Sequence, residues 1–425
     1  MTLAAALAPL RHPAFRNLAL GRLISLLGNA VAPIALAFAV LDLTRSASAL
    51  GLVVGARSLT NVAFVLFGGV IADRLPRHLV MVGSGLLAAA TQAAVAALVL
   101  TGAATVPLLM ALSAVNGMVS AFAWPATAAL VPQTVPGDLL QQANALNRLA
   151  GNGAMIGGAA LGGTLVAAAG PGWGLAVDAA TFALSALFFT LVRVTDVRDR
   201  TAPRQGVLAD LRVGWHEFTA RSWVWIVVLA FTVLNATWVG GFSVLGPAVA
   251  DGTIGRSGWG LVLAVETAGM VAGALVALRL KLRRPLLVGC VCMLAEVAFL
   301  VTLAEWPGSL VTLVVVGFLS GAAVEQFAIA WDMSLQQHIP SDRLARVYAY
   351  DILGSIMAVP LGQIAAGPAA AAIGTSNTLL AAAGINAVAV LAMVASRGVR
   401  GLRAPTPPTA ADPAPVPATT SAVTG

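Results

Sequence analysis

Residues 68–78, GGVIADRLPRH, place an aspartate, two arginines and a histidine within six positions between two apolar runs. Each flanking run has about 20 residues, the length that crosses a hydrocarbon core of ~30 Å as a helix. A short turn that carries arginines between two such runs is typical of a connection between membrane-spanning helices. The stretch therefore predicts helices that cross a bilayer on either side of it.

The composition of the whole chain agrees with this prediction. The 425 residues are 59% hydrophobic and 10% charged, with a mean hydropathy of +0.91, whereas a soluble domain has about 25% charged residues. The chain therefore has too little charge to cover a water-exposed surface. A membrane β-barrel would show alternating segments of about 10 residues, which the sequence lacks. We expect an all-α polytopic membrane protein.

Twelve apolar segments are candidate spans. They are residues 17–41, 47–72, 78–100, 105–131, 146–169, 173–193, 223–249, 257–279, 285–303, 308–331, 348–371 and 376–396.

The basic residues predict the orientation of these spans. If the N-terminus is cytoplasmic, 19 of the 24 arginines and lysines fall on the inner side, and only Arg45 and Arg256 fall on the outer side. Cytoplasmic loops carry an excess of such residues. We therefore expect both termini in the cytoplasm and a multi-pass protein of the bacterial inner (plasma) membrane.

The longest internal connection divides the chain into two halves of six helices. Residues 1–193 form the first half, 194–222 the linker and 223–396 the second half, and 397–425 are predicted to be a disordered cytoplasmic tail. Within the linker, one helical face is apolar, which predicts an amphipathic helix lying in the inner interface; this face carries Val207, Leu208, Leu211, Trp215 and Phe218.

The two halves are similar in sequence. VPGDLLQQANALNRLAG, from Val135, aligns with IPSDRLARVYAYDILGS, from Ile339, and Asn29 in the first span matches Asn235 in the seventh. A duplicated six-helix unit with both copies in the same orientation is the parallel-repeat plan of one class of transporters.

Together with the charged turn, this plan resembles the major facilitator superfamily. The loop between helices two and three of that family carries Gly-x-x-x-Asp-Arg-x-Gly-Arg-Arg/Lys, and Pro76 and His78 replace the second glycine and the last basic residue here. PAFRNLALGRLISLLGNAVAPIALAFAVLDLTRSASALGLV and FAWPATAALVPQTVP resemble its branch of siderophore and macrolide exporters. The resemblance covers roughly residues 10–400. The matching motif residues are Gly69, Asp73, Arg74 and Arg77.

The resemblance implies that Asp73 and Arg77 brace the outward-open state. A carboxylate at a helix end can pair with arginines or meet the positive end of another helix, and contacts made in only one state bias the equilibrium between states. The alternative is that the arginines only follow the positive-inside rule, to which an aspartate adds nothing. Asp351 is placed with these conformational residues, and both it and Asp178 are interpreted as helix caps or interfacial pairs.

The fifth span contains GNGAMIGGAALGGTL, and antiporters of the superfamily have Gly-Pro-x-x-Gly-Gly at this place. Ala159 stands where the proline should be. Small residues one turn apart let helices approach closely, so plain helix packing and a link to antiport both remain open. The glycines concerned are Gly158, Gly162 and Gly163.

Acidic residues inside predicted spans are candidate proton sites, because an ionisable group in the bilayer is costly and usually functional. Glu266 lies about nine residues into the eighth span, ~14 Å deep, and Glu296 is similarly deep in the ninth. Glu325 lies in the inner half of the tenth. The family's architecture places the ninth helix on the outside, which ranks Glu266 and Glu325 before Glu296. Structural ion pairs, with Arg22 or Arg57 as partners, are the alternative.

A substrate cavity should be apolar with a few polar anchors. Candidates fall on the first, fourth, seventh and tenth spans, where packing between helices is an equally good explanation. They are Asn29, Trp124, Asn235, Trp238, Phe242, Phe327 and Trp331.

The sequence contains no nucleotide-binding Gly-x-x-x-x-Gly-Lys-Ser/Thr, no His-Glu-x-x-His and no serine-nucleophile elbow. We therefore expect no enzyme, no cofactor, no metal and, because the basic residues lie in short loops, no nucleic-acid partner. We expect a monomeric secondary transporter that exports a small amphipathic molecule, such as a drug, siderophore or secondary metabolite, in exchange for protons. An uptake permease, a flippase for lysophospholipid or other lipid, and a non-transporting sensor remain alternatives.

Overall fold

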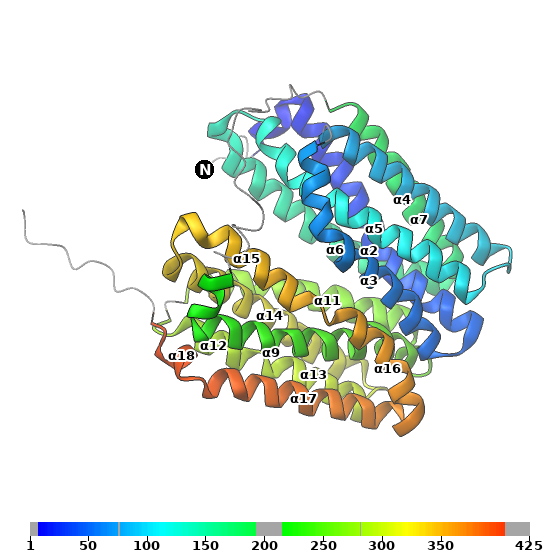
Figure 1. Cartoon of the computed structure of the whole chain (residues 1–425). Coiled ribbons are helices and arrows are strands. Elements are labelled where there is room, and N and C mark those ends of the chain that lie inside the picture. Colours follow the sequence, from blue (N-terminus) through cyan, green and yellow to red (C-terminus); the bar gives the residue numbers. More distant parts are fainter. Residues whose placement is uncertain (1–6, 75–76, 193–214, 281, 404–425) are drawn as a thin grey trace, which may run out of the picture.

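The computed structural model describes residues 7–74, 77–192, 215–280 and 282–403. Within these ranges it gives only the backbone for residues 66–74, 77–78, 123–129, 132, 341–342 and 345. Every regular element in the described ranges is a helix, and the helices form two bundles (Figure 1). We call the bundle of residues 13–190 the N-half and that of residues 222–395 the C-half.

The N-half consists of six long helices. Proline stands in the first turn of α2, α5 and α7, where its missing N–H costs no hydrogen bond. The helices are α2 (Pro13–Thr44), α3 (Ala47–Arg74), α4 (Arg77–Leu100), α5 (Val106–Leu130), α6 (Leu140–Ala169) and α7 (Pro171–Thr190).

The C-half repeats this plan with interrupted helices. The seventh span consists of α9 (Ser222–Val239), the π-helical segment η4 (Gly240–Leu245) and α10 (Gly246–Asp251), and the ninth is divided at Met293. The other elements are α11 (Gly255–Ala277), α12 (Pro285–Cys292), α13 (Leu294–Glu305), α14 (Leu310–His338), α15 (Ser341–Ile356), α16 (Val359–Ile373), α17 (Thr375–Ala395) and α18 (Arg397–Gly401).

The predicted spans agree with these helices except at their ends and breaks. Eleven helices in the described residues have the length and composition of a membrane span, and Val106–Phe122 is a shorter apolar helix. The predicted span 348–371 is two helices, because Pro360 in the first turn of α16 disfavours helical backbone just before it. The predicted span 146–169 starts earlier, at Leu140.

The two halves touch mainly through α3 with α16 and α6 with α11. Gly163 of α6 and Gly260 of α11 meet so closely that a Cβ on Gly260 would lie 2.6 Å from the Gly163 Cα atom. A Cβ on Gly51 of α3 would lie 2.3 Å from the Gln363 carbonyl oxygen of α16. Both contacts lie at the end of the molecule where α2 ends and α3 begins, which we call the closed end.

Away from the closed end the two bundles diverge, towards the end at which α15 and α18 lie (Figure 1). We call this the open end.

An ion pair also joins the halves at the closed end. Arg256, in the first turn of α11, donates from Nη1 to Asp42 Oδ2 of α2 (2.9 Å) and from Nη2 to the other oxygen of that carboxylate. Its Nε donates to Asp251 (3.0 Å), and its guanidinium lies 4.9 Å from the centre of the Phe38 ring. Bidentate arginine–carboxylate pairs are the strong ones among charged hydrogen bonds. Spacing in the sequence gave no sign of this pair, whose members are far apart in the chain.

The end of the linker packs on the C-half. Residues 215–220 are helical, and Trp215 contacts Phe218 and Tyr350 of α15 at ring-centre distances of 5.9 and 5.6 Å. The buried Glu217 accepts hydrogen bonds from Arg221 (2.5 Å) and from Arg343 of α15. Of the predicted amphipathic face, Val207, Leu208 and Leu211 lie outside the described residues. Trp215 and Phe218 are therefore attached to α15.

Glu217 should stabilise the protein at neutral pH and lose this effect only in acid. The hydrogen bond from Arg221, with that from Arg343, lowers the pKa of Glu217. The stability that Glu217 contributes is therefore fully present above its pKa in the unfolded chain, ~4.3. It is lost as pH falls through the lower pKa of the folded protein. The melting temperature of Glu217→Gln should lie below that of the parent by a constant interval down to about pH 5, and the interval should shrink below about pH 4. Exposed Glu305→Gln is the control, and an interval independent of pH would contradict the assignment.

Candidate functional site

Two of the predicted acidic residues interact electrostatically inside the C-half. Glu296, in the first turn of α13, is 5% exposed, and its Oε2 has no hydrogen-bond partner among the described residues. The charge of Glu266 of α11 acts on it. Because the negative charge of each carboxylate disfavours ionisation of the other, the two are suited to hold one proton. Although it stands on the ninth span, Glu296 is buried within the bundle, and its ranking behind Glu266 and Glu325 stays a prediction.

Close packing between α11 and α14 places Glu266. A Cβ on Gly321 of α14 would lie 1.9 Å from the Glu266 carbonyl oxygen, and one on Gly269 would lie 2.1 Å from the Phe318 carbonyl oxygen. Gln326 of α14 donates to the Gly273 carbonyl (2.5 Å). Glycines thus bring the two helix backbones into contact at Glu266 and over the next two turns of α11, and its position is set by backbone rather than by a mobile loop.

Glu325 is placed differently from the other two acids. It is half-buried on α14, and the charges that act on it are those of Arg148 on α6 of the N-half and Asp332 of its own helix. Glu325 and Arg148 are thus opposite charges on opposite halves, with no ion pair between them in this state of the described chain.

Most aromatic candidates for a cavity are packed inside the C-half. Phe242, Phe327 and Trp331 are buried among the helices of the C-half, and their role in a substrate cavity stays a prediction. Trp238 stacks on Phe242, with ring centres 4.7 Å apart. Similar patterns of large apolar side chains arise from packing and from a binding site, which is why the sequence could not separate the two.

Two of the candidates form hydrogen bonds to α15. Trp331 donates its indole N–H to Asp351 (2.9 Å), and Asn235 donates to the Ser355 carbonyl (2.9 Å). Asp351 also accepts from the Ser355 hydroxyl (3.3 Å). Asp351 therefore ties α14 to α15 within one half, and it is not a helix cap.

The charged turn of residues 68–78 lies largely outside the described side chains. The backbone shows α3 ending at Arg74 and α4 beginning at Arg77; the side chains of Asp73, Arg74, Arg77 and Trp124, and the surroundings of Gly69, are outside the described part.

The glycines of α6 face different partners. A Cβ on Gly158 would lie 2.6 Å from Ala30, and one on Gly162 would lie 3.0 Å from Val31, both on α2. Gly163 faces Gly260 across the halves instead. The first two therefore pack the N-half, and only Gly163 belongs to the contact that closes one end.

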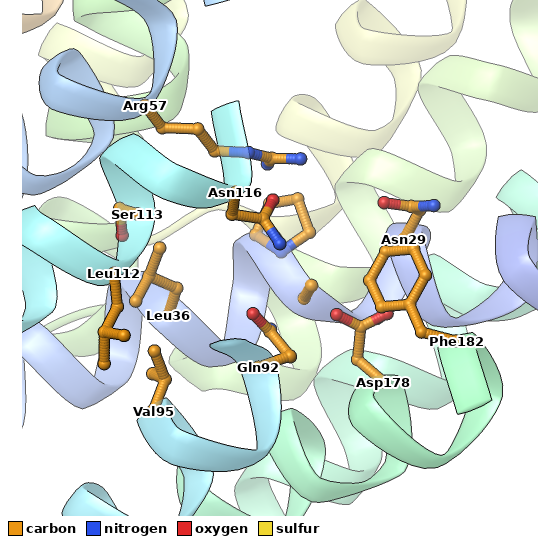
Figure 2. Close-up of a pocket in the computed structure, with 12 residues that line it drawn as sticks. Asn29, Leu36, Arg57, Gln92, Val95, Leu112, Ser113, Asn116, Asp178 and Phe182 are labelled. Carbon is orange, nitrogen blue, oxygen red and sulfur yellow. The ribbon is translucent and has the colours of Figure 1, made fainter. Parts of the chain in front are cut away.

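The N-half contains a buried polar cavity that the sequence did not predict. Asp178 of α7 is 1% exposed and lies about 10 Å from the start of its helix, so its interpretation as a cap is wrong. The cavity is about 20 Å³, and Figure 2 shows the polar ends of several side chains directed into it. The polar residues that line it are Asn29, Arg57, Gln92, Ser113, Asn116 and Asp178.

A second cavity lies between the halves. Its volume is about 340 Å³, and Ile356 and Val359 of the C-half line it together with Asn61 and Ser58 of α3. Arg57 lines this cavity as well as the one that contains Asp178.

Comparison with known proteins identifies the family to which this architecture belongs. Residues 18–350 match the Major Facilitator Superfamily. The chain belongs to that superfamily. As a member of it, the protein is a transporter and not an enzyme, and the two six-helix bundles are the two halves of the superfamily fold.

Relatives within the superfamily differ in closeness. The chain is 28% identical over 371 residues to the multidrug efflux pump Tap of Mycolicibacterium fortuitum, covering 83% of this chain and 88% of that protein. Two solved superfamily structures share the fold. The nucleoside transporter NupG has 15% identity, a TM-score of 0.71 and coverage of 90% and 98%. A bacterial homologue of the human lysosomal transporter Spinster, in an inward-facing and occupied conformation, has 14% identity and a TM-score of 0.70. The match covers 91% of this chain and 96% of that one.

Proposed function

We propose that this superfamily member exports a small amphipathic molecule in exchange for protons. The observation that carries the proposal is the carboxyl pair of Glu266, which is partly buried, and Glu296, which is buried, in the C-half among apolar helices. Such a pair can bind and release a proton inside the membrane. The similarity to a multidrug efflux pump over most of the chain supports export as the direction.

The cycle we propose uses the two ends in turn. In the predicted orientation the open end faces the cytoplasm, and substrate enters between the halves from there or from the inner leaflet. The halves then close at the open end and separate at the closed end, where substrate leaves and a proton enters. Proton release to the cytoplasm returns the protein to the state described here.

Removal of the carboxyl group of Glu266 or of Glu296 should uncouple transport from the proton gradient. In liposomes with an acidic lumen, we expect the purified protein to accumulate ethidium, a fluorescent amphipathic cation. Glu266→Gln and Glu296→Gln should each reduce the gradient-driven rate by about tenfold or more, because glutamine keeps the shape of the side chain and cannot exchange a proton. Glu325→Gln should also reduce it, since the charge of Arg148 on the other half acts on Glu325.

The control is Glu305→Gln, the same change at the exposed end of α13. Full gradient-driven transport in all three interior variants would exclude these acids as coupling groups. Transport in the opposite sense, or accumulation of a labelled lysophospholipid instead of ethidium, would favour the uptake permease or the flippase.

A further inference from the structure

The N-half cavity contains a carboxylate whose partner lies at a distance. Asp178 Oδ1 has no hydrogen-bond partner among the described residues, although the side chain is almost fully buried. Arg57 of α3 is the charged group that acts on it, yet the two do not form a contact ion pair. A buried charge without a direct partner is costly. When ionised, Asp178 therefore depends on the charge of Arg57 for its stabilisation. When protonated, it does not.

The surroundings of Asp178 provide polarity without further charge. Helices α2, α4 and α6 pack on α7, and the first two present Asn29 and Gln92 to the cavity, while α5 presents Ser113 and Asn116. The cavity is large enough for a water molecule, which needs about 10–15 Å³. A water there can bridge the carboxylate to the guanidinium and give Asp178 a route for a proton.

Arg57 connects this cavity with the one between the halves. Its backbone is fixed, because its carbonyl accepts the Thr60 hydroxyl (3.0 Å) and a Cβ on Gly117 would lie 2.0 Å from that carbonyl oxygen. Its long side chain borders both spaces. Figure 2 shows the guanidinium of Arg57 extended past Asn116 at one side of the N-half cavity. The same arginine can therefore direct its charge to Asp178 or to the space between the halves.

We propose that Asp178 and Arg57 form a proton-responsive charge pair that controls the binding of cationic substrates between the halves. When Asp178 is ionised, it holds the Arg57 charge in the N-half. When a proton binds the carboxylate, this attraction ends and the guanidinium turns to the larger cavity. A positive charge there repels a bound cation, so that proton binding and cation binding exclude each other. This inference rests on the proposed antiport and extends it to a substrate class, amphipathic cations.

The pair can be tested without any substrate. In a variant with Cys290 and Cys292 replaced by alanine, Ser58→Cys places a thiol in the larger cavity beside Arg57. Rates of reaction with an anionic, a cationic and a neutral methanethiosulfonate are measured on the purified full chain from about pH 8 to about pH 5.5, the neutral reagent correcting for thiolate. The ratio of anionic to cationic rates reports the charge in the cavity.

With Asp178 present, we expect this ratio to rise about fivefold or more as pH falls. Asp178→Asn should make it high at every pH, and Arg57→Gln should make it low at every pH. Glu305→Gln should keep the parental pH dependence. The Arg57→Gln arm remains decisive should Asp178→Asn not fold.

The proposal would be overturned if the ratio of anionic to cationic rates did not change with pH in the parent. It would also be overturned if the ratio still changed with pH in Asp178→Asn or Arg57→Gln. Because this assay involves neither transport nor a gradient, its result is separate from that of the Glu266→Gln and Glu296→Gln transport assay. Loss of coupling there with a flat ratio here would leave antiport intact and refute only the charge pair.

Discussion

Alanine at Gly163 should remove most of the state in which the closed end is shut, whereas alanine at Gly157 of the same helix should not. A Cβ on Gly163 would lie 2.7 Å from the Gly260 Cα atom and 3.0 Å from the Arg256 carbonyl oxygen. Both neighbours are backbone, so the clash is relieved only if α6 and α11 move apart. Overpacking of this kind costs about 1–3 kcal/mol, and we expect the population of the state to fall about tenfold.

Gly157 is a matched control because a Cβ there would have no atom within 4 Å. The two variants therefore add the same methyl group to the same helix, and each gains the same ~1 kcal/mol of helix propensity.

Spin labels at Leu149 of α6 and at Leu278, directly after α11, both exposed, report how far these helices diverge towards the open end. Distances between the labels should shorten in Gly163→Ala and stay parental in Gly157→Ala. Equal distributions in the two variants would show that the glycine contact does not hold the closed end.

Reversing the charge at Asp42 should open the same end by a different route. Asp42→Arg replaces a bidentate ion pair by two facing guanidinium groups, and like charges brought together across an interface cost several kcal/mol. We expect about a tenfold or greater loss of the state described here, measured with the same labels, and a comparable loss of gradient-driven transport, because the cycle must pass through this state.

The double variant Asp42→Arg with Arg256→Asp restores opposite charges across the halves. Recovery should be partial, because Asp251, which accepts from Arg256 Nε, would then face a second carboxylate. A double variant no better than Asp42→Arg alone would show that Asp42 acts through local folding and not through the pair.

The fold could be predicted from the sequence because a bilayer imposes a simple rule. Each span must be apolar over about 20 residues and must satisfy its own backbone, so that composition alone gave the spans and their order. The ends were less certain. The α6 helix begins at Leu140, in a polar stretch that lies beyond the reach of a hydropathy rule.

The site was harder to predict because a single sequence carries no information on which faces meet. Asp178 and Arg57 stand on α7 and α3, 121 positions apart, and nothing in either segment points to the other. The burial of Glu296 could not be predicted for a similar reason, since its place on the ninth helix says nothing about the rotation of α13. From the sequence, Arg256 was noticed only as a basic residue of the outer side, and Asp42 was not noticed.

The breaks in the C-half have a mechanical consequence. Each described N-half helix, from α2 to α7, is continuous, whereas three C-half spans are interrupted, at η4, at Met293 and before α16. A π-helical turn and a proline break both weaken the backbone ladder locally. The helices of the N-half are therefore stiff, whereas three spans of the C-half can bend at their breaks. The C-half carries the Glu266–Glu296 pair, so protonation there is able to change the shape of a bundle as well as its tilt.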